Sequence, residues 1–177
     1  TEKILRLTSA VDTAEFESAG SQRKCRMRLG LPPERKIIGY VGRLSTLDLE
    51  KGVRLLVRAF ALLSARLPQP CMLLCVGGPQ KEAGEYRRLA EGLGVDRAAV
   101  LFEDIRPRGE MPFWIRSCDV CVVPKPADDR FARSTSPVKL FEYMAARVPI
   151  AAARMPGVTD VLRDGENGLL FDGDSAD

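Results

Sequence analysis

The chain has 177 residues, which suffices for one α/β domain with a full core but would be cramped for two. Its composition, 45% hydrophobic and 29% charged, is that of an ordinary globular protein, and no apolar run approaches the roughly 18 residues of a membrane span. The net charge of +3 comes from scattered basic residues, which argues against a nucleic-acid partner but leaves room for a local anion pocket.

After an irregular opening, short apolar runs alternate with longer helical patterns. The predicted strands are KIIGYVG, CMLLCVGG, AVLFEDI, DVCVVP, PIAAA and GLLF. The predicted helices are residues 51–66, 81–93, 110–117, 137–147 and 158–162. This alternation predicts an α/β fold in which a parallel sheet carries helices on both faces. Ligands of such sheets bind beyond the carboxyl ends of the strands, so the segments that follow the strands are expected to face one crevice.

The cysteines do not form a metal or disulfide pattern. On one strand, Cys71 and Cys75 would lie about 13 Å apart at about 3.3 Å per residue, beyond the roughly 7 Å that a disulfide allows between Cα atoms. All five cysteines are therefore expected to be buried thiols in a reducing compartment. Because the opening residues are too polar for a secretory signal, the cytoplasm is the expected location, with peripheral membrane association of a longer protein left open.

Three basic residues are expected to converge in the crevice. Gly42 and Arg43 follow the first strand, and Lys51 stands at the start of the next helix. Lys139 lies in the first turn of the helix that Ser136 would cap, where a cation opposes the helix dipole at a cost of about 0.3–1 kcal/mol. The alternative is that Arg43 and Lys51 are ordinary exposed cations on a surface turn. Taken with the free N–H groups of that helix start, however, the three cations predict a site for an anion such as pyrophosphate.

Glu142 follows about one and a half turns later on the same helix. Its carboxylate is expected to accept hydrogen bonds from a group attached to the phosphate, with a ribose diol as the obvious candidate. The alternatives are an ion pair with Lys139 at i and i+3, which contributes only a few tenths of a kcal/mol, and a solvated position between apolar stripes.

Six motifs occur in order over almost the whole chain: YVGRL with KG, LLCVGGP, VLFEDI, CDVCVVP, SPVKLFEYMAARVPIAA and GVTDVLRDGENGLLF. Together they resemble the carboxy-terminal, nucleotide-sugar-binding half of a retaining GT-B glycosyltransferase of family 4, the glycosyl transferases group 1. The resemblance implies one Rossmann-like domain over residues 1–177, with the acceptor-binding half before Thr1 in a longer protein. The isolated chain is then expected to bind donor without catalysing transfer.

The resemblance also implies residue roles. Arg43 and Lys51 would act on the donor diphosphate as the catalytic cations, the amides of Val138 and Lys139 would cap it, and Glu142 would bind the ribose. The other implied substrate contacts are Gly42, Gly77, Gly78, the backbone at Ile105, Ser134, Ser136 and Pro137. Two departures from the family stand out. Ser134 occupies a position where many members carry a sugar-associated glutamate, and the gap between Arg43 and Lys51 is wider than usual.

The implied reaction transfers a glycosyl group from a nucleoside diphosphate sugar to a glycan, lipid or small-molecule acceptor, without a cofactor or bound metal. Positive charge stabilises the departing diphosphate, a mechanism that needs no protein nucleophile and suits a chain without histidine. Two other functions stay open: a catalytically inactive nucleotide-binding or regulatory module, and a GT-B sugar-nucleotide epimerase. A dehydrogenase is disfavoured because GYVGRL lacks the last glycine of a dinucleotide-binding turn.

Overall fold

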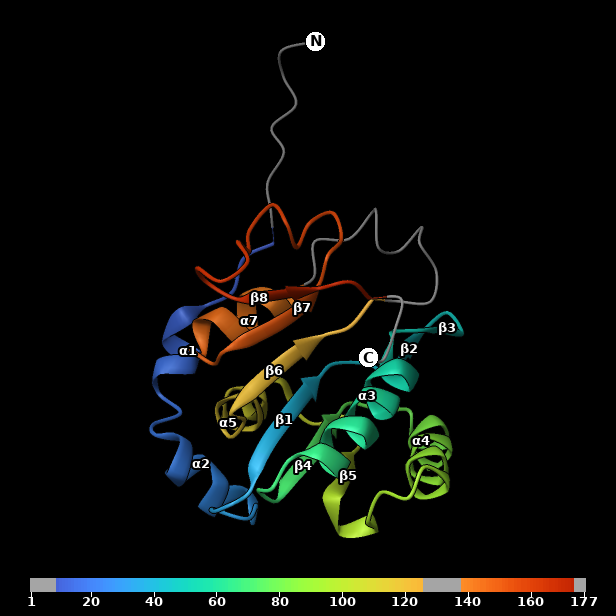
Figure 1. Cartoon of the computed structure of the whole chain (residues 1–177). Coiled ribbons are helices and arrows are strands. Elements are labelled where there is room, and N and C mark those ends of the chain that lie inside the picture. Colours follow the sequence, from blue (N-terminus) through green and yellow to red (C-terminus); the bar gives the residue numbers. More distant parts are fainter. Residues whose placement is uncertain (1–8, 126–137, 174–177) are drawn as a thin grey trace.

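The computed structural model describes residues 9–125 and 138–173. Its main sheet has the strand order β5-β4-β1-β6-β7-β8, and every neighbouring pair is parallel (Figure 1). The strands are β1 Lys36–Val41, β4 Cys71–Val76, β5 Val100–Glu103, β6 Val120–Val123, β7 Ile150–Ala153 and β8 Leu169–Phe171. The predicted parallel α/β fold is thereby confirmed. The strand order reverses between β1 and β6, where a sheet of this type opens a crevice at its carboxyl edge.

Helices cover both faces of the sheet (Figure 1). One face carries α3 Val53–Arg66 and α4 Gln80–Gly92, and the other carries α1 Thr13–Glu17, α2 Gln22–Leu29, α5 Met111–Arg116 and α7 Val138–Ala145. Because strand side chains alternate between the faces, two hydrophobic clusters form. One unites Leu74 with Trp114 and Tyr143, and the other unites Leu73 with Phe60.

The opening contains two short helices, α1 and α2, so the expectation of an irregular opening is wrong for these residues. Each helix has a short polar cap: Asp12 accepts a hydrogen bond from the N–H of Ala14, and Ser21 accepts one from the N–H of Lys24. Phe16 anchors α1 in the core with 3% of its surface exposed. Helices of 5 and 8 residues depend on such packing more than on propensity. Their periodicity was therefore too short to recognise.

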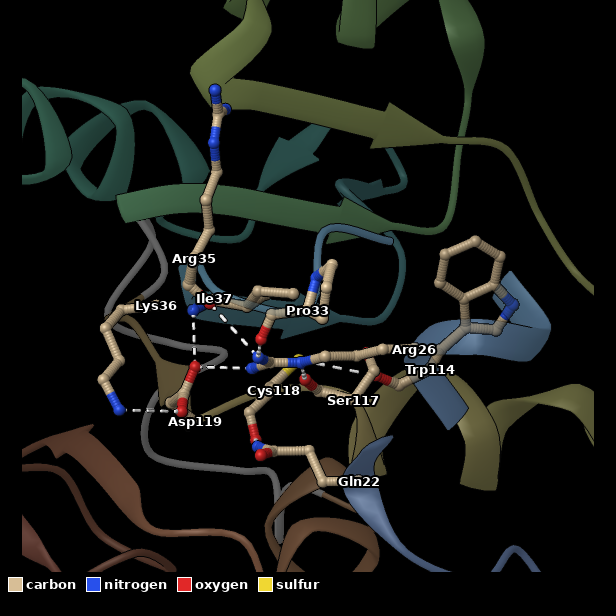
Figure 2. A network of polar contacts seen from close by, with 10 residues as sticks. All are labelled: Gln22, Arg26, Pro33, Arg35, Lys36, Ile37, Trp114, Ser117, Cys118 and Asp119. Atoms are coloured by element: carbon tan, nitrogen blue, oxygen red, sulfur yellow. Dashed lines mark hydrogen bonds and ion pairs between the residues drawn. The ribbon is translucent and has the colours of Figure 1, made fainter. Parts of the chain in front are cut away.

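Arg26 ties α2 to the amino ends of β1 and β6, opposite the crevice (Figure 2). Arg26 is buried, with 5% of its surface exposed. Its guanidinium donates hydrogen bonds to Asp119 Oδ2 at 2.6 Å, to the carbonyl of Ser117 at 2.9 Å and to that of Pro33 at 2.8 Å. Asp119 also accepts a hydrogen bond from the N–H of Ile37 at 2.7 Å. Burial raises the pKa of Asp119, but these hydrogen bonds outweigh burial and bring it below its ordinary value. We interpret this network as a structural node.

The predicted helix over residues 158–162 is wrong, because this segment consists of turns. Its i to i−4 bonds run from the N–H of Thr159 to the carbonyl of Met155, at 3.1 Å, and from the N–H of Leu162 to the carbonyl of Val158, at 2.8 Å. Gly157 lies in left-handed backbone directly before it, with φ 79°, so too few residues remain to nucleate a helix. Val158 and Leu162 are nonetheless buried, so the apolar pattern that suggested a helix has its origin in packing.

All five cysteines are buried free thiols, as predicted. Over residues 9–125 and 138–173, no helix combines the length and the apolar character that spanning a membrane requires.

Candidate functional site

The centre of the crevice is the carboxyl end of β1. The Tyr40 hydroxyl donates a hydrogen bond to the carbonyl of Arg43 at 2.6 Å and accepts one from Lys139 Nζ at 2.9 Å. Lys139 Nζ also lies 4.2 Å from the centroid of the Tyr40 ring, a cation–π contact. A Cβ added at Gly42 would lie 3.3 Å from Lys139 Nζ, so only glycine gives this ammonium its full space. The structure thus brings Gly42, Arg43 and Lys139 together, as predicted.

Lys139 is the most perturbed cation of the crevice. Burial and then the nearby charge of Lys51 lower the pKa of Lys139 to about 7, although the carboxylate of Glu142 counteracts them. Burial lowers the pKa of Lys51 as well. The two ammonium groups are close enough to repel each other, and an anion placed between them would relieve that repulsion.

Lys51 is held at the crevice by a hairpin, which occupies the wide gap between Arg43 and Lys51. The hairpin consists of β2 Ser45–Thr46 and β3 Leu49–Glu50, and its two-residue tip has both residues in left-handed backbone. The N–H of Lys51 donates to the carbonyl of Leu44 at 3.1 Å. A Cβ at Gly52, φ 84°, would lie 2.3 Å from the carbonyl oxygen of Lys125, so this turn packs directly against the segment after β6. Helix α3 therefore begins at Val53 rather than at Lys51.

The segments after β4 and β5 form the next wall. A Cβ at Gly77 would lie 2.5 Å from the carbonyl oxygen of Gly42, and one at Gly78 would lie 2.5 Å from Asp104 Oδ1. Both glycines are thus required by the close approach of neighbouring strand ends, a reason that holds with or without a nucleotide. A pocket of about 280 Å³ lies here, between the hairpin and the start of α4, and Arg43, Gly78 and Ile105 all line it.

Glu142 lies on α7, partly buried, and Val138 at the start of the same helix is 47% exposed. Burial raises the pKa of Glu142 above its ordinary value, although the charges of Arg108 and Lys139 oppose this shift. Lys139 bonds to Tyr40 and forms no ion pair with Glu142, so the simple surface-pair alternative is not what the structure shows. Among the described residues, no hydrogen bond or ion pair engages the Glu142 carboxylate.

Three predicted contacts, Ser134, Ser136 and Pro137, lie outside the described residues. Two residues that sequence reasoning missed belong to the crevice. Tyr40 lies in the segment GYVGR, beside the predicted residues Gly42 and Arg43. As a residue inside a strand it was expected to pack in the core, so the sequence did not indicate its contact with Lys139. Arg108 lies in the 3₁₀ turn η2 Arg108–Glu110, just after the segment EDIRP that was already assigned to the crevice.

A larger cavity lies elsewhere in the described part of the chain. It encloses about 510 Å³ between α3 and strands β1, β6 and β7, and its described walls are apolar apart from Asp172 at the rim. A diphosphate needs cations and N–H groups, so the charged crevice is the better candidate site.

Comparison with known proteins agrees with this geometry. The sequence profile of the family described as glycosyl transferases group 1 matches residues 35–177. The chain belongs to this family. Among curated relatives, the D-inositol 3-phosphate glycosyltransferase of Corynebacterium glutamicum is 35% identical over 168 residues, covering 91% of this chain and 38% of that protein. The enzyme of the same name from Acidothermus cellulolyticus is 36% identical and covers 97% of this chain and 38% of that protein. This group 1 chain thus spans less than half the length of these relatives.

Solved structures show the same fold. Anabaena HepE, crystallised with UDP-glucose, matches with a TM-score of 0.74 and 24% identity over 94% of this chain and 43% of that one. The carboxy-terminal domain of a group 1 glycosyl transferase, LpcC of Francisella tularensis, matches with a TM-score of 0.73 and 20% identity over 94% of this chain and 82% of that one. The fold of this group 1 chain is that of the carboxy-terminal domain of a GT-B glycosyltransferase.

Proposed function

We propose that this chain is the donor-nucleotide-binding domain of an enzyme that transfers a glycosyl group from a nucleoside diphosphate sugar to an acceptor. The observation that carries the proposal is the partly buried Lys139, whose ammonium bonds to Tyr40 at the start of α7 and whose pKa falls to about 7 beside Lys51. Two cations so close together favour an anion, and a diphosphate has the charge to match both. Relatives named as glycosyltransferases and the complex of HepE with UDP-glucose support a sugar nucleotide as that ligand.

The donor would lie along the carboxyl edge of β1. Arg43, Lys51 and Lys139 face its diphosphate, and the N–H groups at the start of α7 add the positive end of a helix dipole. Glu142 accepts hydrogen bonds from the ribose hydroxyls. The backbone at Ile105 meets the base.

The proposed chemistry is electrostatic. The bond between the anomeric carbon and the terminal phosphate oxygen breaks, and the electron pair passes to the diphosphate. The acceptor oxygen bonds to the anomeric carbon and passes its proton to an oxygen of the departing diphosphate. Arg43 and Lys51 stabilise the charge that develops on the leaving diphosphate, which requires neither a protein nucleophile nor a bound metal. We propose retention at the anomeric carbon. The acceptor, a glycan, lipid or small molecule, binds mainly to the rest of a longer protein.

A thermal-shift panel tests donor binding. UDP, GDP and ADP, each alone and as a sugar conjugate, are compared with their parent nucleosides. A ligand at 100 times its Kd stabilises the folded state by about 2.7 kcal/mol. For a chain of this size, that corresponds to a rise in Tm of about 5–10 °C. A rise with one diphosphate family and none with its nucleoside is expected. The absence of any rise with all three families, at millimolar ligand, contradicts the proposal.

A further inference from the structure

The hairpin β2–β3 separates two of the cations that the proposed function assigns to the diphosphate. Arg43 precedes it and Lys51 follows it. Leu44 anchors its base, since its side chain is 1% exposed and its N–H donates to the carbonyl of Gly78 at 3.0 Å. The conformation of the hairpin therefore sets the positions from which both cationic side chains extend.

Four side chains, Ser45, Glu50, Glu82 and Tyr86, join the hairpin to α4, and we call them the latch. The Ser45 hydroxyl donates to Glu82 Oε1 at 2.5 Å. The Tyr86 hydroxyl donates to Glu50 Oε1 at 3.4 Å. Since Glu82 and Tyr86 are four residues apart, they lie on the same face of α4. Both strands of the hairpin are thus tied to one helix.

Glu50 extends the latch to α3. The residue before this helix is Gly52, which has no side chain to cap it, and Glu50 Oε1 instead accepts the N–H of Arg54 at 2.7 Å. A carboxylate at a helix start is also favoured by the dipole. The latch consequently connects the hairpin with both helices on its face of the sheet.

The hairpin would not hold this conformation by itself. Strands of two residues are too short to be stable alone. Leu47 and Asp48 adopt φ of 51° and 59°, a backbone region that residues with a Cβ disfavour. The second carboxylate oxygen of Glu82 is buried without a hydrogen-bond partner in the described part of the chain, which is also unfavourable. Such local cost at a candidate site is typical of a conformation maintained for function.

We propose that Ser45 and Glu82 are positioning residues for the donor. Their hydrogen bond holds the hairpin against α4 and thereby directs Arg43, which lines the same pocket as both residues, toward the diphosphate. The proposal rests on the proposed function, because it requires a diphosphate in the crevice. Ser45 and Glu82 act through Arg43 and need no contact with the donor.

The test compares Ser45→Ala, Glu82→Ala and Glu82→Gln with wild type, and uses Glu85→Ala, an exposed position on α4, as matched control. Each 177-residue protein is titrated calorimetrically with inorganic pyrophosphate, with UDP, GDP and ADP, and with their nucleosides. Ser45→Ala and Glu82→Ala are expected to weaken pyrophosphate and nucleoside diphosphate binding by the same factor, about 3- to 10-fold for one hydrogen bond. Nucleoside binding stays unchanged. Glu82→Gln binds the diphosphates at least as tightly as wild type, because its amide oxygen still accepts from Ser45 and the negative charge is gone.

Loss of the Glu82 charge and loss of its positioning role predict opposite changes in diphosphate affinity. Removing the negative charge of Glu82 would by itself strengthen anion binding, so weaker binding by Glu82→Ala identifies positioning. The double variant Ser45→Ala/Glu82→Ala should bind no more weakly than the weaker single variant, since both remove one interaction. Hydrogen exchange at the Lys51 amide should accelerate in both single variants, even without ligand.

The positioning role of Ser45 and Glu82 is overturned if Ser45→Ala and Glu82→Ala bind diphosphates as tightly as wild type or more tightly. It is also overturned if nucleoside binding weakens by the same factor. Either result leaves the proposed function in place. Failure of wild type to bind any of these diphosphates overturns the proposed function and the latch together.

Discussion

Donor binding should depend on pH through Lys139. In the unliganded protein the pKa of Lys139 is about 7, so half of its ammonium groups are charged at neutral pH and about 1% at pH 9. A diphosphate binds the charged form and raises this pKa. If the pKa in the complex lies well above 9, the affinity falls about 50-fold between pH 7 and pH 9. The ligand contributes little to this change, because a terminal phosphate with a second pKa near 6 is already ionised throughout the range.

Calorimetric titration of wild type and Lys139→Met with a nucleoside diphosphate measures this dependence. Wild type should take up protons on binding at pH 8, which titration in two buffers of different ionisation enthalpy detects. Lys139→Met should bind weakly and with a much shallower pH dependence, because only the lesser shift of Lys51 remains. A wild-type affinity that is flat from pH 7 to pH 9, or two profiles that run parallel, would refute the reasoning.

The same pKa predicts an effect on stability. The folded pKa of about 7 lies below the unfolded value of about 10.4, so the unfolded state binds more protons between these limits. The penalty for burying the ammonium is complete below pH 7 and disappears as pH rises toward 10.4. The unfolding free energy of unliganded wild type should therefore rise from pH 7 to pH 9 relative to that of Lys139→Met, as urea titration can measure.

Two further substitutions separate binding from stability. Arg43→Ala should weaken nucleoside diphosphate binding about 10- to 150-fold, the loss expected for a charge-assisted hydrogen bond, while nucleoside binding stays the same in calorimetry; equal losses would place Arg43 outside the diphosphate site. Arg26→Ala leaves Asp119 without its guanidinium partner and should lower the free energy of unfolding by about 3 kcal/mol in urea, at the low end for a buried pair because the Asp119 side chain is 23% exposed. Asp119 also accepts hydrogen bonds from the N–H of Ile37 and, at 3.4 Å, from Lys36 Nζ, and a decrease below about 1 kcal/mol would show that these two suffice.

The sheet was predictable because its strands are near-continuous apolar runs separated by helix-length segments. Gly42, Arg43 and Lys139 could be assigned to one crevice for the same reason. Gly42 and Arg43 follow a strand and Lys139 lies at the start of a helix, and both positions face the carboxyl edge of the sheet. Hydrophobic periodicity could not predict the short elements. The hairpin at Ser45–Glu50 has two residues per strand and a tip of Leu47 and Asp48, without the Asn-Gly or Asp-Gly pair that usually marks such turns.

Side-chain pairing across the fold was equally hidden. Nothing in the local sequence indicates that Tyr40 accepts a hydrogen bond from Lys139, which lies 99 positions away, or that Glu82 accepts one from Ser45. Lys139 was nevertheless noticed, because a cation in the first turn of a helix is locally unfavourable. Its depressed pKa is the structural form of the same anomaly.

Glu142 offers the most direct test of the central claim that this chain binds a sugar nucleotide. Wild type and Glu142→Ala are each titrated with the nucleoside diphosphate that stabilises wild type best and with inorganic pyrophosphate, which has no ribose. If the carboxylate holds the ribose hydroxyls, the substitution costs about 1.5–3 kcal/mol, or about 10- to 150-fold, with the nucleotide. Pyrophosphate affinity should stay the same or rise slightly, since a nearby negative charge is removed. Unchanged nucleotide affinity in Glu142→Ala, at a Kd that is measurable in wild type, would contradict the account.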